Sequence, residues 1–288
     1  PLDYRYGCQE FKEIWSELGR HQRQLEVERA LVWAHMEMGK VSPEDYAKVA
    51  EIAVPSVVTK ERVSEIEAET RHDIMALTKA MAEAAGEAGW CIHLGATSND
   101  IVDTAVGLQL RDSIILLRKQ LCNLISVTAN LAERERDTVM LGRTHGQAAS
   151  PSTFGKEINV FLSRLDNEIK TLKSIKVKGK WGGATGNFHT LVLIDEKKNW
   201  INFIKGFFKF IKTPLNTLTT QIEPHDCIAE LSHSIIRINN ILIDMNRDIW
   251  MYISNDLFKL KVIKGEVGSS TMPHKVNPID FENSEGNL

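Results

Sequence analysis

The chain has 288 residues, of which 43% are hydrophobic and 25% charged, and its formal net charge is −3. This length indicates roughly two domains of ~100–200 residues each. The composition excludes a disordered tail, a collagen-like chain and a small disulfide scaffold. The charge argues against a dedicated nucleic-acid binder, which is usually strongly basic. No run of ~18 apolar residues is present, so we expect no contact with a membrane.

The four cysteines are far apart and form no C-x-x-C pair. Such spacing is typical of free thiols in a reducing cytosol, so a cytoplasmic protein is expected. Cysteines and histidines do not cluster with the spacing of a tetrahedral zinc site, and no metal is expected. The cysteines are Cys8, Cys91, Cys122 and Cys227.

Proline placement leaves long stretches without helix breakers. Residues 56–150 and 152–213 contain no proline, and such stretches with helical periodicity predict long helices. Near the N-terminus, apolar residues recur at i, i+3, i+4 and i+7, which predicts one amphipathic helix over residues 8–39. Ser42-Pro43 predicts the start of another helix, with serine as N-cap and proline in the first turn.

The longest predicted helix runs from Asn99 to about Arg136. At 1.5 Å per residue it is a rod of roughly 55 Å, which can bury its apolar stripe only against partners of similar length. Segments 152–175 and 225–252 repeat the pattern, and strand signals are weak throughout. We therefore expect an all-α fold, with a small N-terminal helical domain over residues 1–94 and an elongated long-helix bundle over residues 95–288.

The composition changes near residue 150. Alanine occurs 18 times in residues 1–150 and twice afterwards, whereas asparagine rises from 3 to 13. The change is consistent with compositional drift and a solvated, lysine-rich face. A second interpretation is that the two halves derive from different sources.

The densest cluster of reactive side chains lies in residues 268–278, GSSTMPHKVNP. Its glycine, prolines and asparagine predict a loop. Exposed amides beside Ser269 and Ser270, with the cation of Lys275 and the amide of Asn277, suit the binding of an anion or the stabilisation of charge that develops on a carboxylate. A plain polar connection between helices is the alternative.

Four further clusters carry candidate groups. His145, in residues 142–147, is a candidate general acid or base, although a structural histidine between helices is the commoner case. In residues 95–100, Thr97 or Ser98 could cap the longest helix, or the amides there could hold a carboxylate. Residues 71–73 fall within a predicted helical stretch, where polar side chains most often simply face the solvent, and residues 219–226 place polar groups just before another helix.

Together these clusters resemble the fumarase/aspartase superfamily in order and spacing, and within it the family of adenylosuccinate lyases. The sequences GSSTMPHKVNP and RTHGQ favour that family over fumarases and aspartases, whose sequences differ from RTHGQ after the threonine. The resemblance covers essentially the whole chain. Five motifs carry it: residues 268–278 with 279–283, residues 143–147, residues 97–100 with 103–105, residues 70–73, and residues 3–7.

The resemblance implies a β-elimination that releases fumarate from adenylosuccinate, giving AMP, and from the succinylated carboxamide ribotide of purine biosynthesis. It implies Ser269 as the base, with Ser270 as a rival, His145 as the general acid, and Glu282 as the carboxylate that orients this histidine. No cofactor is implied. The residues implied to bind substrate are Arg5, Tyr6, His72, Asp73, Thr97, Ser98, Thr144, Gln221, Lys275 and Asn277.

Members of the resembled family continue beyond the point that matches Leu288, so we expect that the C-terminal part of the bundle and a further helical domain are absent from this chain. The family also implies a homotetramer whose active sites are shared between subunits, with a small nucleotide as substrate. Two alternatives remain: another lyase of the superfamily, such as argininosuccinate lyase or fumarase, and a catalytically silent helical homologue.

Overall fold

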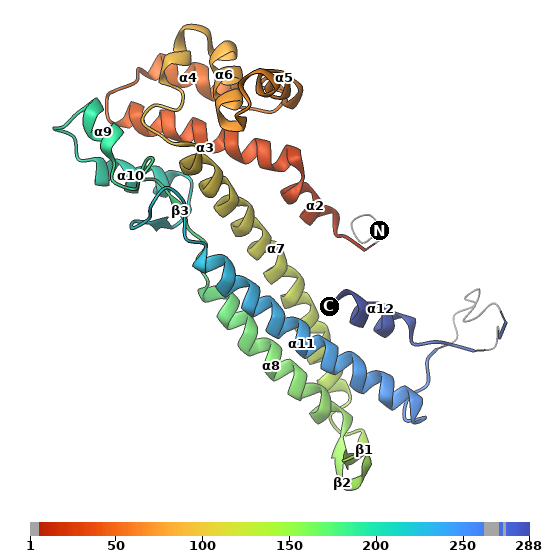
Figure 1. Cartoon of the computed structure of the whole chain (residues 1–288). Coiled ribbons are helices and arrows are strands. Elements are labelled where there is room, and N and C mark those ends of the chain that lie inside the picture. The colour runs from red at the N-terminus through yellow and green to blue at the C-terminus, as the bar shows by residue number, and fades with distance from the viewer. Residues whose placement is uncertain (1–5, 262–270, 273–274) are drawn as a thin grey trace. The chain divides into compact units, whose positions relative to one another are not determined.

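The computed structural model describes residues 6–261, 271–272 and 275–288, and most of these residues are helical (Figure 1). The all-α prediction is confirmed. The helices are α2 Gln9–Trp15, α3 Glu17–Glu37, α4 Pro43–Ile52, α5 Lys60–Thr70, α6 Asp73–Ala85, the 3-10 helix η1 Gly86–Cys91, α7 Ser98–Arg134, α8 Phe154–Ser174, α9 His189–Ile194, α10 Trp200–Phe210, α11 Asp226–Ser254 and α12 Ile279–Asn287. The strands are β1 Val139–Thr144, β2 Gln147–Thr153, β3 Gly179–Lys180 and β4 Leu215–Asn216.

The chain divides into two compact units. Unit 1 comprises residues 1–117 and 176–228, and unit 2 comprises residues 118–175 and 229–288. This grouping cuts α7 after Leu117, whereas the sequence analysis placed a boundary at residue 94. The predicted domains 1–94 and 95–288 remain a prediction.

Helix caps explain several boundaries in unit 1. The Ser42 hydroxyl accepts the Asp45 amide at 3.0 Å, and Pro43 occupies the first turn of α4, as predicted. The prediction of one helix over residues 8–39 is wrong, because α2 ends at Trp15. Ser16 takes an extended conformation and its hydroxyl accepts the Gly19 amide at 2.9 Å, which caps α3.

One apolar core holds unit 1 together. It is formed by α3, α6, the first half of α7 and the segment that carries α10, and Phe207, Leu25 and Leu31 are fully buried in it. Trp181 joins this core, with its ring 4.7 Å from that of Phe207 in an edge-on arrangement. Aromatic rings packed in this way contribute beyond their buried area, so residues 181–210 are anchored firmly in unit 1.

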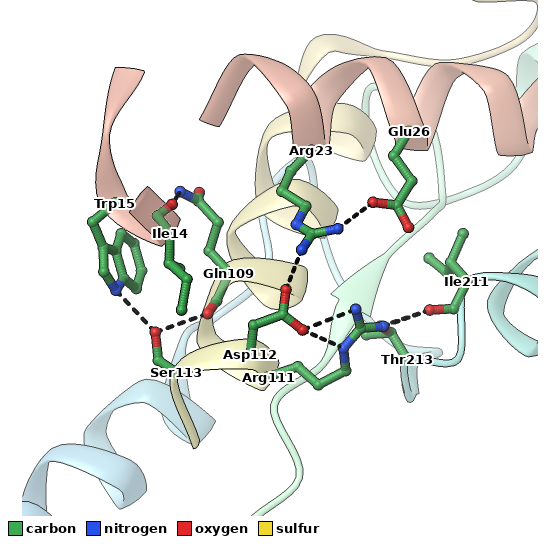
Figure 2. A network of polar contacts seen from close by, with 10 residues as sticks. All are labelled: Ile14, Trp15, Arg23, Glu26, Gln109, Arg111, Asp112, Ser113, Ile211 and Thr213. Carbon is green, nitrogen blue, oxygen red and sulfur yellow. Dashed lines mark hydrogen bonds and ion pairs between the residues drawn. The ribbon is translucent and has the colours of Figure 1, made fainter. Parts of the chain in front are cut away.

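Polar contacts add a second tie between the N-terminal helices and α7 (Figure 2). The Trp15 indole donates to the Ser113 hydroxyl at 2.9 Å. Arg23 of α3 pairs with Asp112, whose carboxylate also binds Arg111 at 3.0 Å. The side chains of Arg23 and Asp112 are 27% and 19% exposed, so the network lies at the edge of the core.

Unit 2 is built on long helices and a hairpin. Apolar residues of α7, α8 and α11 form its core, with Leu165 fully buried. The predicted helices at 152–175 and 225–252 are confirmed by α8 and α11. At the end of α11, Asn246 donates to the Ser284 hydroxyl of α12 at 2.8 Å, which ties the C-terminal helix to the unit.

The structure contains an antiparallel hairpin of β1 and β2, although the sequence signals for strands are weak throughout. Its register runs from Val139 opposite Thr153 to Thr144 opposite Gln147, and a bulge interrupts it after Leu141. β3 and β4 form a short parallel pair in unit 1. Within the described residues, no helix is long and apolar enough to cross a membrane.

Candidate active-site segments

Of residues 268–278, called the signature loop below, the structure describes residues 271–272 and 275–278. Ser269, Ser270 and His274 lie outside the described residues. Lys275 is exposed and its amide donates to the Met272 carbonyl at 3.0 Å. Asn277 is half-buried. Arg5 also lies outside the described residues, and its neighbour Tyr6 is 48% exposed.

Glu282 is placed by α12, which begins directly after this loop. The helix follows Pro278, whose carbonyl accepts the Glu282 amide at 3.2 Å. The carboxylate is exposed in the first turn of α12, where the helix dipole favours a negative charge.

His145 lies at the tip of the hairpin in unit 2. The two central residues of the turn, His145 and Gly146, have φ values of +55° and +72°. Two left-handed residues define a type I′ turn, which matches the twist of a two-residue hairpin. The Arg143 guanidinium donates to the Gly146 carbonyl at 3.1 Å and closes the turn. The turn holds the imidazole in an exposed position, rather than between two helices as the sequence suggested.

A cavity of about 590 Å³ adjoins this hairpin and the end of α11, and Arg143 and Thr144 are among its lining residues. Tyr252 and Asp248 line it from α11. Burial raises the pKa of Tyr252 to about 12, and the charge of Asp248 adds to this effect. Burial and the neighbouring acids Asp244 and Glu157 raise the pKa of Asp248. Thr144 therefore borders a hollow lined by both acidic and basic residues: Glu157, Asp248, Arg143 and Lys156.

In unit 1, the junction of α5 and α6 places His72 against the start of α7. His72 is the N-cap of α6, not part of a continuous helix, and its Nδ1 accepts the Met75 amide at 3.4 Å. Its Nε2 lies 3.5 Å from the Ser98 hydroxyl. Asp73, the next residue, pairs with Arg20 at 3.5 Å.

The loop before α7 is fixed from two sides. The buried Glu28 carboxylate accepts both the His93 amide at 3.2 Å and its ring Nδ1 at 2.6 Å. His35 contacts the Leu94 carbonyl through Nε2 at 2.8 Å. Burial lowers the pKa of His93, but the charge and hydrogen bond of Glu28 outweigh it, and the pKa is raised. These contacts hold the chain that leads to Thr97.

Two carboxylates in the first two turns of α7 fix the remaining segments. Asp100 accepts the Thr97 amide at 2.9 Å. Asp103 accepts the Glu223 amide at 2.8 Å, and this contact holds the chain that follows Gln221, whose side chain is exposed.

The structure thus gathers His72, Asp73, Thr97, Ser98 and Gln221 in unit 1. His72 and Ser98 are close enough to contact each other. Unit 2 carries Thr144, His145, Lys275, Asn277 and Glu282. No group of three or more acidic, histidine or cysteine side chains in the described ranges could hold a metal ion.

Sequence reasoning did not single out Lys180, which lies fully buried beside Asp100. A lysine next to glycines carries no sequence signal for burial, since lysine is usually exposed. The sequence signal that could have pointed to a buried cation is a pair of carboxylates, Asp100 and Asp103, which lie about one turn apart on the same long helix.

The fold consists of long helices, with a polar loop ahead of the longest one. Comparison with known proteins identifies the family to which it belongs. A family model described as "Lyase" matches residues 5–288, and the chain belongs to this lyase family. Two solved structures share the fold. They are the 3-carboxy-cis,cis-muconate lactonizing enzyme from Pseudomonas putida, with 27% identity, a TM-score of 0.84 and coverage of 99% of this chain and 64% of that one, and a fumarate lyase from Mesorhizobium sp. BNC1, with 27% identity, a TM-score of 0.80 and coverage of 96% and 62%.

Among curated proteins, the chain is similar to adenylosuccinate lyases. It is 44% identical to that of Vibrio cholerae over 79% of this chain and 52% of the relative. Identity is 39% with the enzyme of Pyrococcus abyssi, over 98% of this chain and 63% of the relative, and 39% with that of Escherichia coli, over 100% and 67%. The chain therefore spans about half to two thirds of the length of these relatives, and the resemblance seen in the motifs is confirmed.

Proposed function

We propose that this protein is an adenylosuccinate lyase, which eliminates fumarate from adenylosuccinate and from the succinylated carboxamide ribotide of purine biosynthesis. The similarity to adenylosuccinate lyases at 39% identity along the whole chain carries the proposal. Membership of the lyase family supports the reaction class.

In the proposed reaction, Ser269 removes a proton from the succinyl carbon next to a carboxylate. The electron pair forms the new double bond of fumarate while the C–N bond breaks, and His145 donates a proton to the departing nitrogen. Ser269 can act as a base only as an alkoxide, which needs stabilisation by amides and positive charge. Lys275 and Asn277 would supply that charge and an amide, and Glu282 would orient His145 and raise its proton affinity.

The start of α7 suits the second part of the proposal, binding of the succinyl carboxylates by Thr97 and Ser98. The helix is 37 residues long, and its first amides carry the positive end of the dipole. His72 Nε2 lies 3.5 Å from the Ser98 hydroxyl, and this hydroxyl can donate to an anion. Asp73, Gln221 and Thr144 would orient the substrate. Arg5 and Tyr6 would contact the nucleotide phosphate.

The substrate assignment is tested by fumarate release from three compounds: adenylosuccinate, argininosuccinate and malate. We expect turnover of the first alone. Turnover of argininosuccinate or malate in its place would identify another lyase of the superfamily, and no turnover of any compound by a folded protein would favour a catalytically silent homologue.

The mechanism is tested with Ser269→Ala, Ser270→Ala and His145→Asn. Asparagine tolerates the left-handed backbone at residue 145, so the hairpin is retained. Loss of the general acid should reduce kcat by roughly 10²–10⁴-fold, whereas His189→Asn, at another exposed histidine, should leave it unchanged. Turnover within threefold of wild type in both Ser269→Ala and His145→Asn contradicts the mechanism. A loss in Ser270→Ala alone transfers the base to that residue.

We also propose a homotetramer with active sites shared between subunits, and a location in the cytoplasm. The resemblance to the lyase family and the free thiols support these statements. Sedimentation equilibrium tests the assembly, and a monomer at micromolar concentration contradicts it. Cell fractionation tests the location, which recovery of the protein outside the cytoplasmic fraction contradicts.

A further inference from the structure

Lys180 and Asp100 form an ion pair that is fully buried in unit 1. The Lys180 ammonium lies 2.8 Å from Asp100 Oδ1, and both side chains are 0% exposed. The ammonium also donates to the carbonyls of Gln221 at 2.6 Å and Gly183 at 3.3 Å. Its three hydrogens therefore each have an acceptor.

The Asp100 carboxylate is as fully engaged as its partner. Oδ1 accepts the Gly182 amide at 3.0 Å, and Oδ2 accepts the amides of Thr97 at 2.9 Å and Gly183 at 3.2 Å. Every one of these backbone groups belongs to a loop or to a segment that ends a strand, not to a helix ladder. The pair thus replaces secondary structure as the element that fixes these loops.

Two of the fixed groups belong to segments that the proposed function places at the substrate. The Thr97 amide precedes Ser98, and the Gln221 carbonyl belongs to a residue proposed to orient the substrate. Thr97 and Gln221 are 124 positions apart in the chain, and the ion pair connects them through two side chains. Thr104 adds support, because its hydroxyl donates to the Lys180 carbonyl at 3.0 Å.

Stability alone is a weak reason for such a pair. Removing two charges from water costs several kcal/mol per ion, and well-packed apolar residues in their place are often neutral or stabilising. The contacts described above instead specify the position of backbone groups from three separate segments. A buried pair with every hydrogen bond satisfied rigidifies what it touches.

We propose that Lys180 is a positioning residue which, through Asp100, sets the Thr97–Ser98 segment and, directly, sets the Gln221 segment for the succinyl carboxylates. Lys180 itself does not contact the substrate. The assignment of these segments to the substrate rests on the proposed function, whereas the coupling of the two segments rests on the contacts alone.

Hydrogen exchange measures the coupling without any assay of activity. In Lys180→Met, amide exchange should accelerate at least tenfold in both segments 92–98 and 216–223. Arg23→Met, which breaks the ion pair with Asp112 in the same unit, should leave both segments unchanged. Acceleration in only one of the two segments, or equal acceleration throughout unit 1, overturns the coupling.

The double variant Asp100→Asn with Lys180→Met separates positioning from stability, because it leaves no buried charge unpaired. We expect its melting temperature to recover to that of Arg23→Met, while kcat/KM for adenylosuccinate stays at least tenfold below wild type, chiefly through KM. A kcat/KM within threefold of wild type at that melting temperature overturns the positioning role.

Wild-type protein gives a test even where the variants do not fold. The amides of Thr97 and Gly183 share one acceptor, Asp100 Oδ2, so their protection factors should agree within tenfold. A larger difference overturns the fixing of both amides by Asp100, on which the coupling of the two segments depends. Wild type that turns over no adenylosuccinate refutes the proposed function and not the coupling, since exchange reports the latter independently.

Discussion

Replacing Glu28 by glutamine removes the buried charge that faces His93 and leaves the shape of the site almost unchanged. The Glu28 carboxylate is 0% exposed and accepts two hydrogen bonds from His93, one from the amide and one from the ring. The glutamine oxygen can accept the His93 amide, and the glutamine NH2 group can donate to Nδ1 of the neutral ring. A hydrogen bond to a charged group contributes about 1.5–3 kcal/mol and a neutral one about 0.5–1.5 kcal/mol, so losing the charge costs about 1 kcal/mol at every pH.

A second cost depends on pH, because the carboxylate raises the pKa of His93 above its ordinary value. A pKa that is higher in the folded state contributes stability that is complete below the unfolded value of about 6.5 and is lost as the pH rises through the folded value. Each unit by which the glutamine lowers the native pKa of His93 therefore appears as about 1.4 kcal/mol at low pH and vanishes at high pH.

Urea unfolding at pH 5.5 and pH 8.5 measures both costs. We expect Glu28→Gln to destabilise the protein at both values, with a loss that is larger at pH 5.5 by about 1.4 kcal/mol per unit of pKa. Each loss is measured as a difference from wild type, because burial lowers the pKa of His35 and this alone makes the stability of wild type fall as the pH decreases. Glu83→Gln, whose partner Arg62 stays charged, is the control, with the same small loss at both pH values. Equal losses for Glu28→Gln at the two pH values would refute the reasoning.

Two further substitutions test packing and backbone geometry. Leu165→Ala, at a side chain that is 0% exposed, should cost about 2–5 kcal/mol in urea unfolding, and Val127→Ala, at 66% exposure, less than about 0.5 kcal/mol; equal costs would contradict the core of unit 2. Gly186→Ala should lower the melting temperature more than Gly183→Ala, because both glycines have φ near +75° but only at Gly186 would the Cβ meet a backbone oxygen, that of Thr219 at 2.0 Å; equal shifts would mean that backbone strain alone decides.

The long helices could be predicted because their apolar periodicity extends over many turns. α7 was expected over residues 99–136 and runs over Ser98–Arg134. The break at Ser16 was missed because the apolar stripe continues across it, and the interruption depends on one hydroxyl that accepts the Gly19 amide. A cap of this kind competes with helix continuation by little energy, so periodicity cannot reveal it.

The hairpin was missed for a different reason. Its strands carry glycine, proline and several exposed small residues, which lack the apolar alternation of a half-buried strand. The Thr144-His145-Gly146-Gln147 turn has a glycine at one of its left-handed positions, but histidine at the other is an uncommon choice. The motifs supply the candidate site residues, whose roles remain a prediction, whereas the burial of Lys180 depends on segments that are distant in sequence and emerges only from the fold.

The bulge in the hairpin has a consequence for His145. Between Leu141–Pro151 and Arg143–Ala148, β2 has one residue more than β1, and an extra residue bends the strand and increases its twist. The direction in which the tip points is therefore encoded several residues away from the tip. Deleting Ala149 would straighten the hairpin and change the direction of the imidazole while leaving all four residues of the turn in place. The orientation of His145 can therefore be altered without changing the turn that carries it.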